Sequence, residues 1–85
     1  MKNFKKQVED FFIFADRLTV HIFKSGCYDL AISGNFGCMT YLSNKYAIRI
    51  GDMRICIRPT DKIKVENNML ILKYGKGEKI IFEKI

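Results

Sequence analysis

The chain has 85 residues, of which 48% are hydrophobic and 28% charged, and its formal net charge is +6. This length favours one domain, residues 1–85, with a small core, and the composition excludes a disordered or fibrous chain. No apolar run approaches the roughly 20 residues that span a bilayer. Acidic residues also precede the apolar run Phe11–Ala15, so we expect no signal peptide, no membrane contact and a cytoplasmic location. The positive charge permits binding to nucleic acid or acidic surfaces but requires neither.

The first segment predicts a helix over residues 3–17. Its apolar side chains recur at helical spacing, at Phe4, Val8, Phe11, Phe12, Ala15 and Leu18. Ile13 and Phe14 widen this face beyond one packing surface. Three interpretations stay open: both are buried in a tightly wrapped core, the helix has a second edge for a partner, or Phe11–Phe14 is partly extended.

Residues 18–84 predict strands and turns. Alternating or apolar runs cover residues 18–24, 28–33 and 36–42, and they are separated by Ser25-Gly26 and by Gly34-Asn35. Ser43-Asn44 ends the third of these runs, and Pro59 ends the strands that follow, because proline cannot donate to a ladder.

The central stretch, residues 45–59, predicts a β-hairpin. Two alternating runs flank Gly51-Asp52, and a glycine at the first turn position supplies positive φ without steric cost. This register places Arg49 opposite Arg54 and Lys45 opposite Arg58. Like charges directly opposite each other destabilise a sheet, so this face needs an anionic partner, inside the molecule or outside it.

The last quarter predicts two further hairpins with one common register. A turn at Asn67-Asn68 pairs Val65 with Leu70, and a three-residue loop at residues 75–77 pairs Leu70 with Phe82. Both turns place the same apolar side chains on one face of the sheet. These are Ile63, Val65, Leu70, Leu72, Ile80 and Phe82.

These elements together predict an α+β fold that is mostly β. An N-terminal helix is followed by an antiparallel meander of seven or eight short strands. So many short strands favour strong curling into a small barrel or sandwich, with the helix over the open end or one face.

The sequence shows no arrangement typical of catalysis, metal binding or a cofactor. Three cysteines and one histidine, Cys27, Cys38, Cys56 and His21, lack the close ligand spacing of structural zinc sites. We interpret the cysteines as small buried hydrophobic residues. The segment Gly75-Lys76-Gly77 lacks the frame of a phosphate-binding loop.

Two surfaces are candidate binding sites. Lys45, Arg49, Arg54 and Arg58 would share one face of the hairpin and bind nucleic acid or another anion. Alternatively, Asp52, Asp61 or Glu66 neutralises these side chains internally. The second surface is an uncharged loop in which Asn35 and Phe36 would contact a protein partner. The alternative there is a phenylalanine that folds back into the core.

Two family resemblances are present. The segment Leu18–Phe23 followed by Lys24-Ser25-Gly26 resembles the start of an Sm-like RNA-binding domain, although no Asp follows Gly34 as that family requires. Residues 28–85 are similar to YabP/YqfC-type sporulation proteins, through Ile32 and Gly37, Tyr41, the Ile48-Arg49-Ile50 triplet and the final Glu83-Lys84-Ile85. That similarity implies a non-enzymatic role in spore formation and supplies no catalytic residue.

We therefore expect a small non-enzymatic binding module that acts through a protein partner. One alternative is a nucleic-acid-binding β-barrel that uses the basic hairpin face. Another is a small inhibitor or adaptor encoded by a mobile element. Sheet edges that no barrel closes would favour homo-oligomers.

Overall fold

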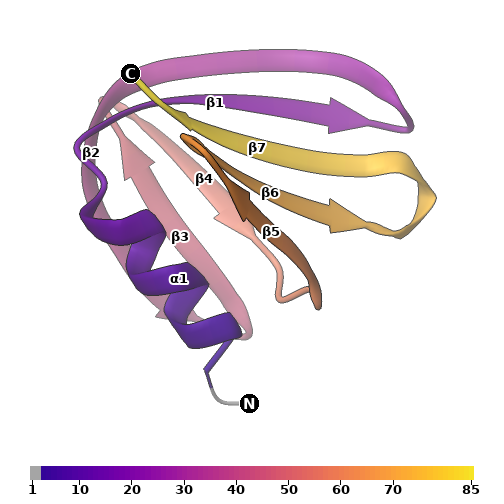
Figure 1. The fold of residues 1–85 in the computed structure, drawn as a ribbon, viewed down its shortest axis with the longest axis horizontal. Coiled ribbons are helices and arrows are strands. Elements are labelled where there is room, and N and C mark those ends of the chain that lie inside the picture. The colour runs from indigo at the N-terminus through magenta and orange to yellow at the C-terminus, as the bar shows by residue number, and fades with distance from the viewer. Residues whose placement is uncertain (1–2) are drawn as a thin grey trace.

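The computed structural model describes residues 3–85 as one helix followed by seven strands (Figure 1). This confirms the predicted mostly-β fold with an N-terminal helix. The elements are α1 (Lys5–Phe14), β1 (Arg17–Lys24), β2 (Cys27–Leu42), β3 (Lys45–Ile50), β4 (Met53–Ile57), β5 (Lys62–Glu66), β6 (Met69–Tyr74), the short turn η1 (Gly75–Gly77) and β7 (Glu78–Lys84).

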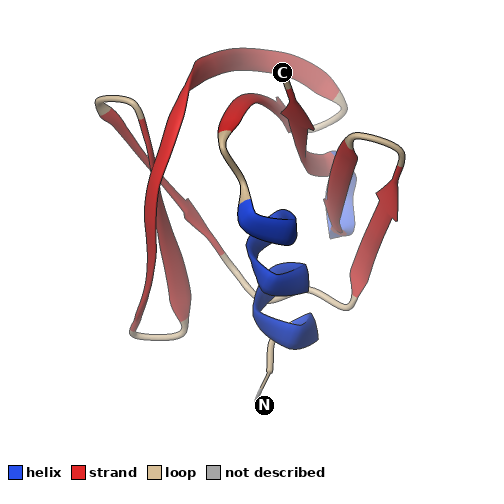
Figure 2. Cartoon of the chain, turned by 60° about the vertical axis from the view of Figure 1, so that its left-hand side comes forward, coloured by secondary structure: helices blue, strands red, loops and turns tan. Residues whose placement is uncertain are grey.

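All seven strands form one antiparallel sheet in the order β4-β3-β2-β1-β7-β6-β5. The chain meanders through β1–β4 and again through β5–β7, and β7 joins the two halves by pairing with β1. Figure 2 shows that the sheet curls strongly around its concave side. The sheet stays open, because β4 and β5 are its two edges.

The sequence predicts two strands, residues 28–33 and 36–42, where the structure has the single strand β2 of 16 residues. Its first half pairs with β1 and its second half pairs with β3, so β2 joins β1 to the β3–β4 hairpin. The predicted break at Gly34-Asn35 is therefore wrong. Gly34 instead allows β2 to pass close to Gly51. A Cβ at Gly34 would lie 3.1 Å from the Gly51 Cα. The Gly51 N–H donates to the Asn35 carbonyl at 2.7 Å.

The two C-terminal hairpins have the predicted register. Val65 pairs with Leu70, and Leu70 pairs with Phe82. Asn67 adopts φ +55, as the tight turn requires. The inward-facing apolar side chains therefore come from β5, β6 and β7 together, although Val65 on the edge strand β5 remains 42% exposed.

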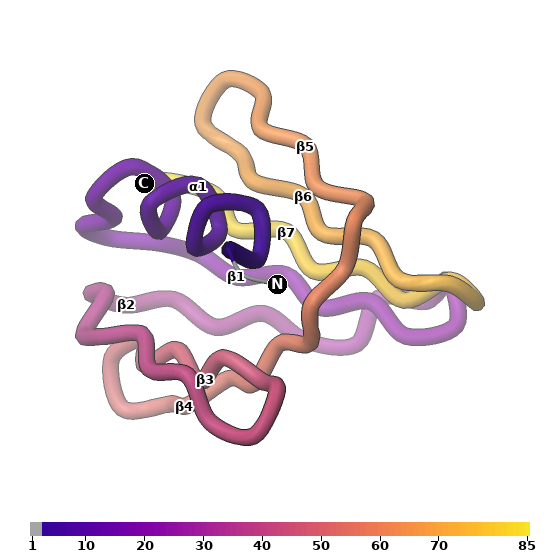
Figure 3. Tube along the Cα trace, turned by 90° about the horizontal axis from the view of Figure 1, so that it is seen from below, coloured from indigo at the N-terminus to yellow at the C-terminus, as the bar shows by residue number. Residues whose placement is uncertain are grey.

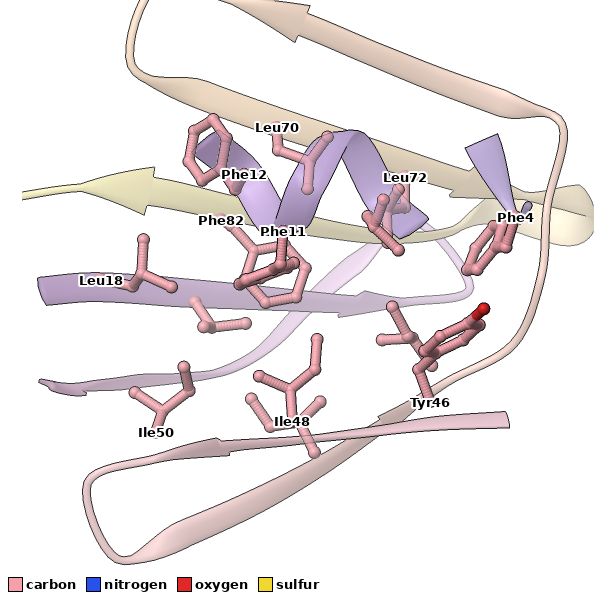
Figure 4. Close-up of a cluster of buried hydrophobic side chains, with 14 residues drawn as sticks. Phe4, Phe11, Phe12, Leu18, Tyr46, Ile48, Ile50, Leu70, Leu72 and Phe82 are labelled. Carbon is pink, nitrogen blue, oxygen red and sulfur yellow. The ribbon is translucent and has the colours of Figure 1, made fainter. Parts of the chain in front are cut away.

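The core fills the space between α1 and the concave side of the sheet (Figures 3 and 4). Phe11 of α1 lies with its ring centroid 5.3 Å from Phe82 of β7, edge to face, and both side chains are buried. Burial of one large apolar side chain stabilises a fold by about 1.5–3 kcal/mol. The helix supplies Phe4, Val8, Phe11 and Phe12.

The helix is shorter than the predicted range 3–17. It ends at Phe14, because the next residues join the sheet: the Asp16 carbonyl accepts from the Phe36 N–H at 2.7 Å, and β1 begins at Arg17. Ile13 is 52% exposed and Phe14 is 82% exposed, so the interpretation that both are buried is wrong. Their exposure agrees with the alternative of a second, outward edge of the helix.

The backbone of α1 winds in the left-handed sense, with positive φ at all its residues except Phe11. For L-residues this hand costs roughly 1–2 kcal/mol per residue relative to a right-handed helix. The spacing i, i+4, i+7 brings the same side chains onto one face in a helix of either hand. Burial of the Val8 and Phe11 side of α1 therefore does not depend on the hand.

Candidate binding surface

The β3–β4 hairpin reverses where the sequence predicts. Gly51 has φ +58, and Ile50 pairs with Met53 across the two-residue turn. Arg49 consequently lies directly opposite Arg54. Both arginines are exposed on the convex side of the sheet, whereas Ile48 and Ile55 beside them are buried in the core. The predicted pairing of Arg49 with Arg54 is confirmed. The predicted pairing of Lys45 with Arg58 is wrong, because the ladder between β3 and β4 ends before these two residues.

A bulge in β2 gives the Arg49 side chain its room. Gly37 interrupts the register between β2 and β3, because Phe36 pairs with Ile50 and Cys38 already pairs with Arg49. A Cβ at Gly37 would lie 3.3 Å from the Arg49 Nε, so glycine leaves space for the guanidinium above β2. We call the outward side of this three-stranded region the arginine face. It consists of Cys38, Thr40, Leu42, Lys45, Ala47, Arg49, Arg54 and Cys56.

The expected internal neutralisation of the arginine face does not occur within residues 3–85. No carboxylate of the described chain lies within 4.0 Å of a cationic nitrogen of Lys45, Arg49 or Arg54. The interpretation that Asp52, Asp61 or Glu66 neutralises these side chains is therefore wrong. Glu66 instead contacts Lys64 at 3.3 Å, because both lie on the edge strand β5.

Arg58 does not join the other three cations. It follows the end of β4, and its Nη2 lies 3.0 Å from the Glu78 Oε1. Its guanidinium carbon also lies 4.5 Å from the ring centroid of Tyr74. The Tyr74 hydroxyl donates to the Arg58 carbonyl at 2.6 Å. Burial, only partly offset by the nearby Arg58 charge, raises the pKa of Tyr74 to about 12.

Asn35 and Phe36 lie within β2 and not in a loop, so the loop prediction is wrong. Phe36 is partly buried, and its ring centroid lies 5.1 Å from that of Phe11. The alternative, in which this phenylalanine packs toward the core, matches the structure. Asn35 is exposed, and its backbone carbonyl accepts a hydrogen bond from the Gly51 N–H. A protein contact at these two residues stays a prediction.

The three cysteines and the histidine do not form a common site over residues 3–85. Cys27, Cys38 and Cys56 are all free and exposed, so their interpretation as buried residues is wrong. They occupy outward positions or turn-flanking positions of strands β2 and β4. His21 has its Nε2 3.1 Å from the Glu83 Oε1 and its Nδ1 3.4 Å from the Tyr28 hydroxyl. Over residues 3–85, no three His, Cys, Asp or Glu side chains gather as a metal site would require.

Sequence reasoning assigned no role to a second group of cations, on the convex side of β5–β7. Lys62, Lys73 and Lys79 lie on one face, and their alignment across strands follows from the register of the two C-terminal hairpins. The spacing of the two turns in the sequence therefore indicated that these three lysines share one face.

Comparison with known proteins gives no relative: no family model, no curated protein and no solved structure matches the chain. Within the part of the chain that the structure describes, no helix combines the length and the apolar character needed to cross a bilayer.

Proposed function

We propose that this chain is a non-enzymatic binding module that recognises an acidic segment of a protein partner through the arginine face. One observation carries the proposal. Arg49 and Arg54 lie directly opposite each other, and within residues 3–85 neither has a carboxylate within 4.0 Å. Such a pair is unfavourable in the free protein, and a bound carboxylate would relieve it.

The chemistry of the arginine face favours a protein over a nucleic acid. A guanidinium binds carboxylates through two parallel hydrogen bonds, and arginine is enriched in protein interfaces while lysine is depleted. The residues beside the arginines are small: Ala47 pairs with Cys56. Single-strand binders need exposed aromatic rings there, but Tyr46 is buried and Tyr74 lies under Arg58. Tyr41 is 58% exposed, but it pairs with Tyr46 and lies on the opposite side of the sheet.

Nucleic-acid binding at Lys45, Arg49, Arg54 and Arg58 remains a second candidate. It is weaker because Arg58 already contacts Glu78. A role in spore formation is a proposal that rests on the sequence resemblance alone. A cytoplasmic setting is a proposal that rests on the short apolar run Phe11–Ala15 and the acidic residues before it. The edge strands β4 and β5 offer the backbone groups through which a homo-oligomer would form.

The proposal is tested by selection from a displayed library of random peptides. We expect the parent protein to enrich peptides with clustered Asp and Glu. The variant Arg49→Glu/Arg54→Glu should lose this enrichment. The variant Arg49→Lys/Arg54→Lys keeps the charge but removes the planar fork, so it should retain weaker binding.

The matched control is Lys62→Glu/Lys73→Glu, which changes the net charge by the same amount on the other half of the sheet. It should select the same acidic peptides as the parent. The proposal is overturned if the parent enriches no acidic sequence, or if the control loses binding as strongly as Arg49→Glu/Arg54→Glu does.

A further inference from the structure

The convex side of β5, β6 and β7 carries three lysines in one cross-strand row. Lys79 of β7 pairs with Lys73 of β6, and Lys73 pairs with Lys62 of β5. Lys62 and Lys73 are exposed, and Lys79 is partly exposed. Among residues 3–85, no carboxylate lies within 4.0 Å of any of the three amines, and nearby Glu78 is engaged by Arg58. Directly opposed like charges destabilise the free sheet.

Two aromatic side chains extend this row across β1 and β2. Phe23 pairs with Lys79 on one side and with Tyr28 on the other. The two rings meet edge to face at 5.2 Å, and the Lys79 amine lies 4.7 Å from the Phe23 ring centroid. Tyr28 is 55% exposed. We call these five residues, in the order Tyr28, Phe23, Lys79, Lys73 and Lys62, the lysine–aromatic row.

The surface beside the row is hollowed. A cavity of about 470 Å³ is lined by Phe23, by the three lysines and by the turn Gly75–Gly77, together with Tyr74 and the one carboxylate of the lining, Glu78. Lys76 at the tip of this turn adds a fourth cation. Adjacent strands lie about 4.8 Å apart, so the three paired lysines present their charges over roughly 10 Å. A row of this length suits an extended polyanion better than one small ion.

We propose that the lysine–aromatic row binds single-stranded nucleic acid. Lysines would contact successive phosphates, and Tyr28 with Phe23 would form the platform on which a base stacks. Positive grooves with adjoining aromatic rings are typical of single-strand binders. Stacking requires unpaired bases, which a duplex does not offer. Lysine is depleted in protein interfaces, so an acidic protein fits this surface less well than it fits the arginine face. The proposal concerns a different surface and does not rest on the function proposed above.

The test uses fluorescence anisotropy with a labelled oligothymidylate of about 12 nucleotides, within the range of known single-strand site sizes. The slope of log affinity against log salt counts displaced phosphate counterions, at about 0.7 per contact for single strands. We expect Lys62→Gln/Lys73→Gln/Lys79→Gln to lower this slope by about 2. The matched control, Lys45→Gln/Arg49→Gln/Arg54→Gln, removes the same number of charges and should leave the slope unchanged.

Stacking is tested separately with Tyr28→Ala. Loss of one stacked base should weaken affinity by roughly 5- to 150-fold. The salt slope should stay that of the parent, because Tyr28 contacts no phosphate in this arrangement. Circular dichroism of each variant verifies that it is folded, and the single variants Lys73→Gln and Lys79→Gln replace the triple variant if that one unfolds.

Three outcomes overturn the proposal. The first is a parent protein that does not bind the oligonucleotide at about 50 mM salt. The second is an equal loss of slope in the lysine variant and its control, which would reflect net charge alone. The third is binding to vesicles of anionic phospholipid, at the same lysines, without binding to the oligonucleotide. Support requires the difference between the two matched variants together with the loss in Tyr28→Ala.

Discussion

Replacement of Arg49 by glutamate should stabilise the free protein. Ile50 and Met53 flank a two-residue turn and form its hydrogen-bonded pair. Arg49 and Arg54 are the next pair along, which is non-hydrogen-bonded, and in such pairs the side chains approach most closely. The variant Arg49→Glu converts this close repulsion into a close attraction.

The size of the effect follows from the spacing. Two unit charges about 5 Å apart in bulk water repel by 332/(80 × 5), or about 0.8 kcal/mol, which agrees with the roughly 0.2–1 kcal/mol found for cross-strand pairs. Removing this repulsion and adding an attraction of similar size, less the lower strand preference of glutamate, gives a gain of about 1 kcal/mol. For a domain of this length the unfolding midpoint should rise by about 4–8 °C.

Thermal and urea unfolding at low salt measure the gain. It should shrink near 1 M salt, where the screening length falls to about 3 Å. The double variant Arg49→Glu/Arg54→Glu restores like charges and should lose the gain. Lys45→Glu is the control, because Lys45 pairs with Leu42 and faces no cation in the ladder. The reasoning is refuted if Arg49→Glu is no more stable than the parent at low salt, or if Lys45→Glu gains as much.

Two further predictions follow from the packing. Phe36→Ser should destabilise the fold by about 2 kcal/mol or more in urea unfolding, because it removes the contact with Phe11; unchanged stability would place this ring outside the core. The raised pKa of Tyr74 favours the neutral hydroxyl in the folded state, so its stabilisation is full below about pH 10 and is lost as pH rises toward 12. The variant Tyr74→Phe should not lose stability in this alkaline range. An identical dependence of stability on pH in the parent and the variant would contradict the raised pKa of Tyr74.

The parts of the fold that could be predicted from sequence are those fixed by local turn chemistry. Gly51 and Asn67 adopt the positive φ that a tight turn needs, and each turn determines the partners of its flanking strands. Because a one-residue slip would exchange the two faces of a strand, these turns also identified which side chains lie outward. The pairing of Arg49 with Arg54 could be predicted from the sequence for this reason.

The parts that sequence could not give depend on contacts between distant segments. Gly34 looks like a turn signal, but it allows β2 to pass close to Gly51, and nothing near it in sequence indicates that partner. Arg58 was counted with the hairpin cations, whereas Glu78 and Tyr74 from the other half of the chain hold it. Alternation shows which side of a strand is outward but not which strand lies beside it.

A two-dimensional ¹H–¹⁵N NMR titration tests the central claim, that the curled sheet carries two separate anion-binding surfaces, most directly. An acidic peptide should shift the amide signals of Arg49, Arg54 and their neighbours on β3 and β4. An oligothymidylate should shift those of Lys73, Lys79 and Tyr28 instead. Signals that move together for both probes, or changes spread evenly over the chain, would contradict the account, because they would show attraction to net charge without a defined surface.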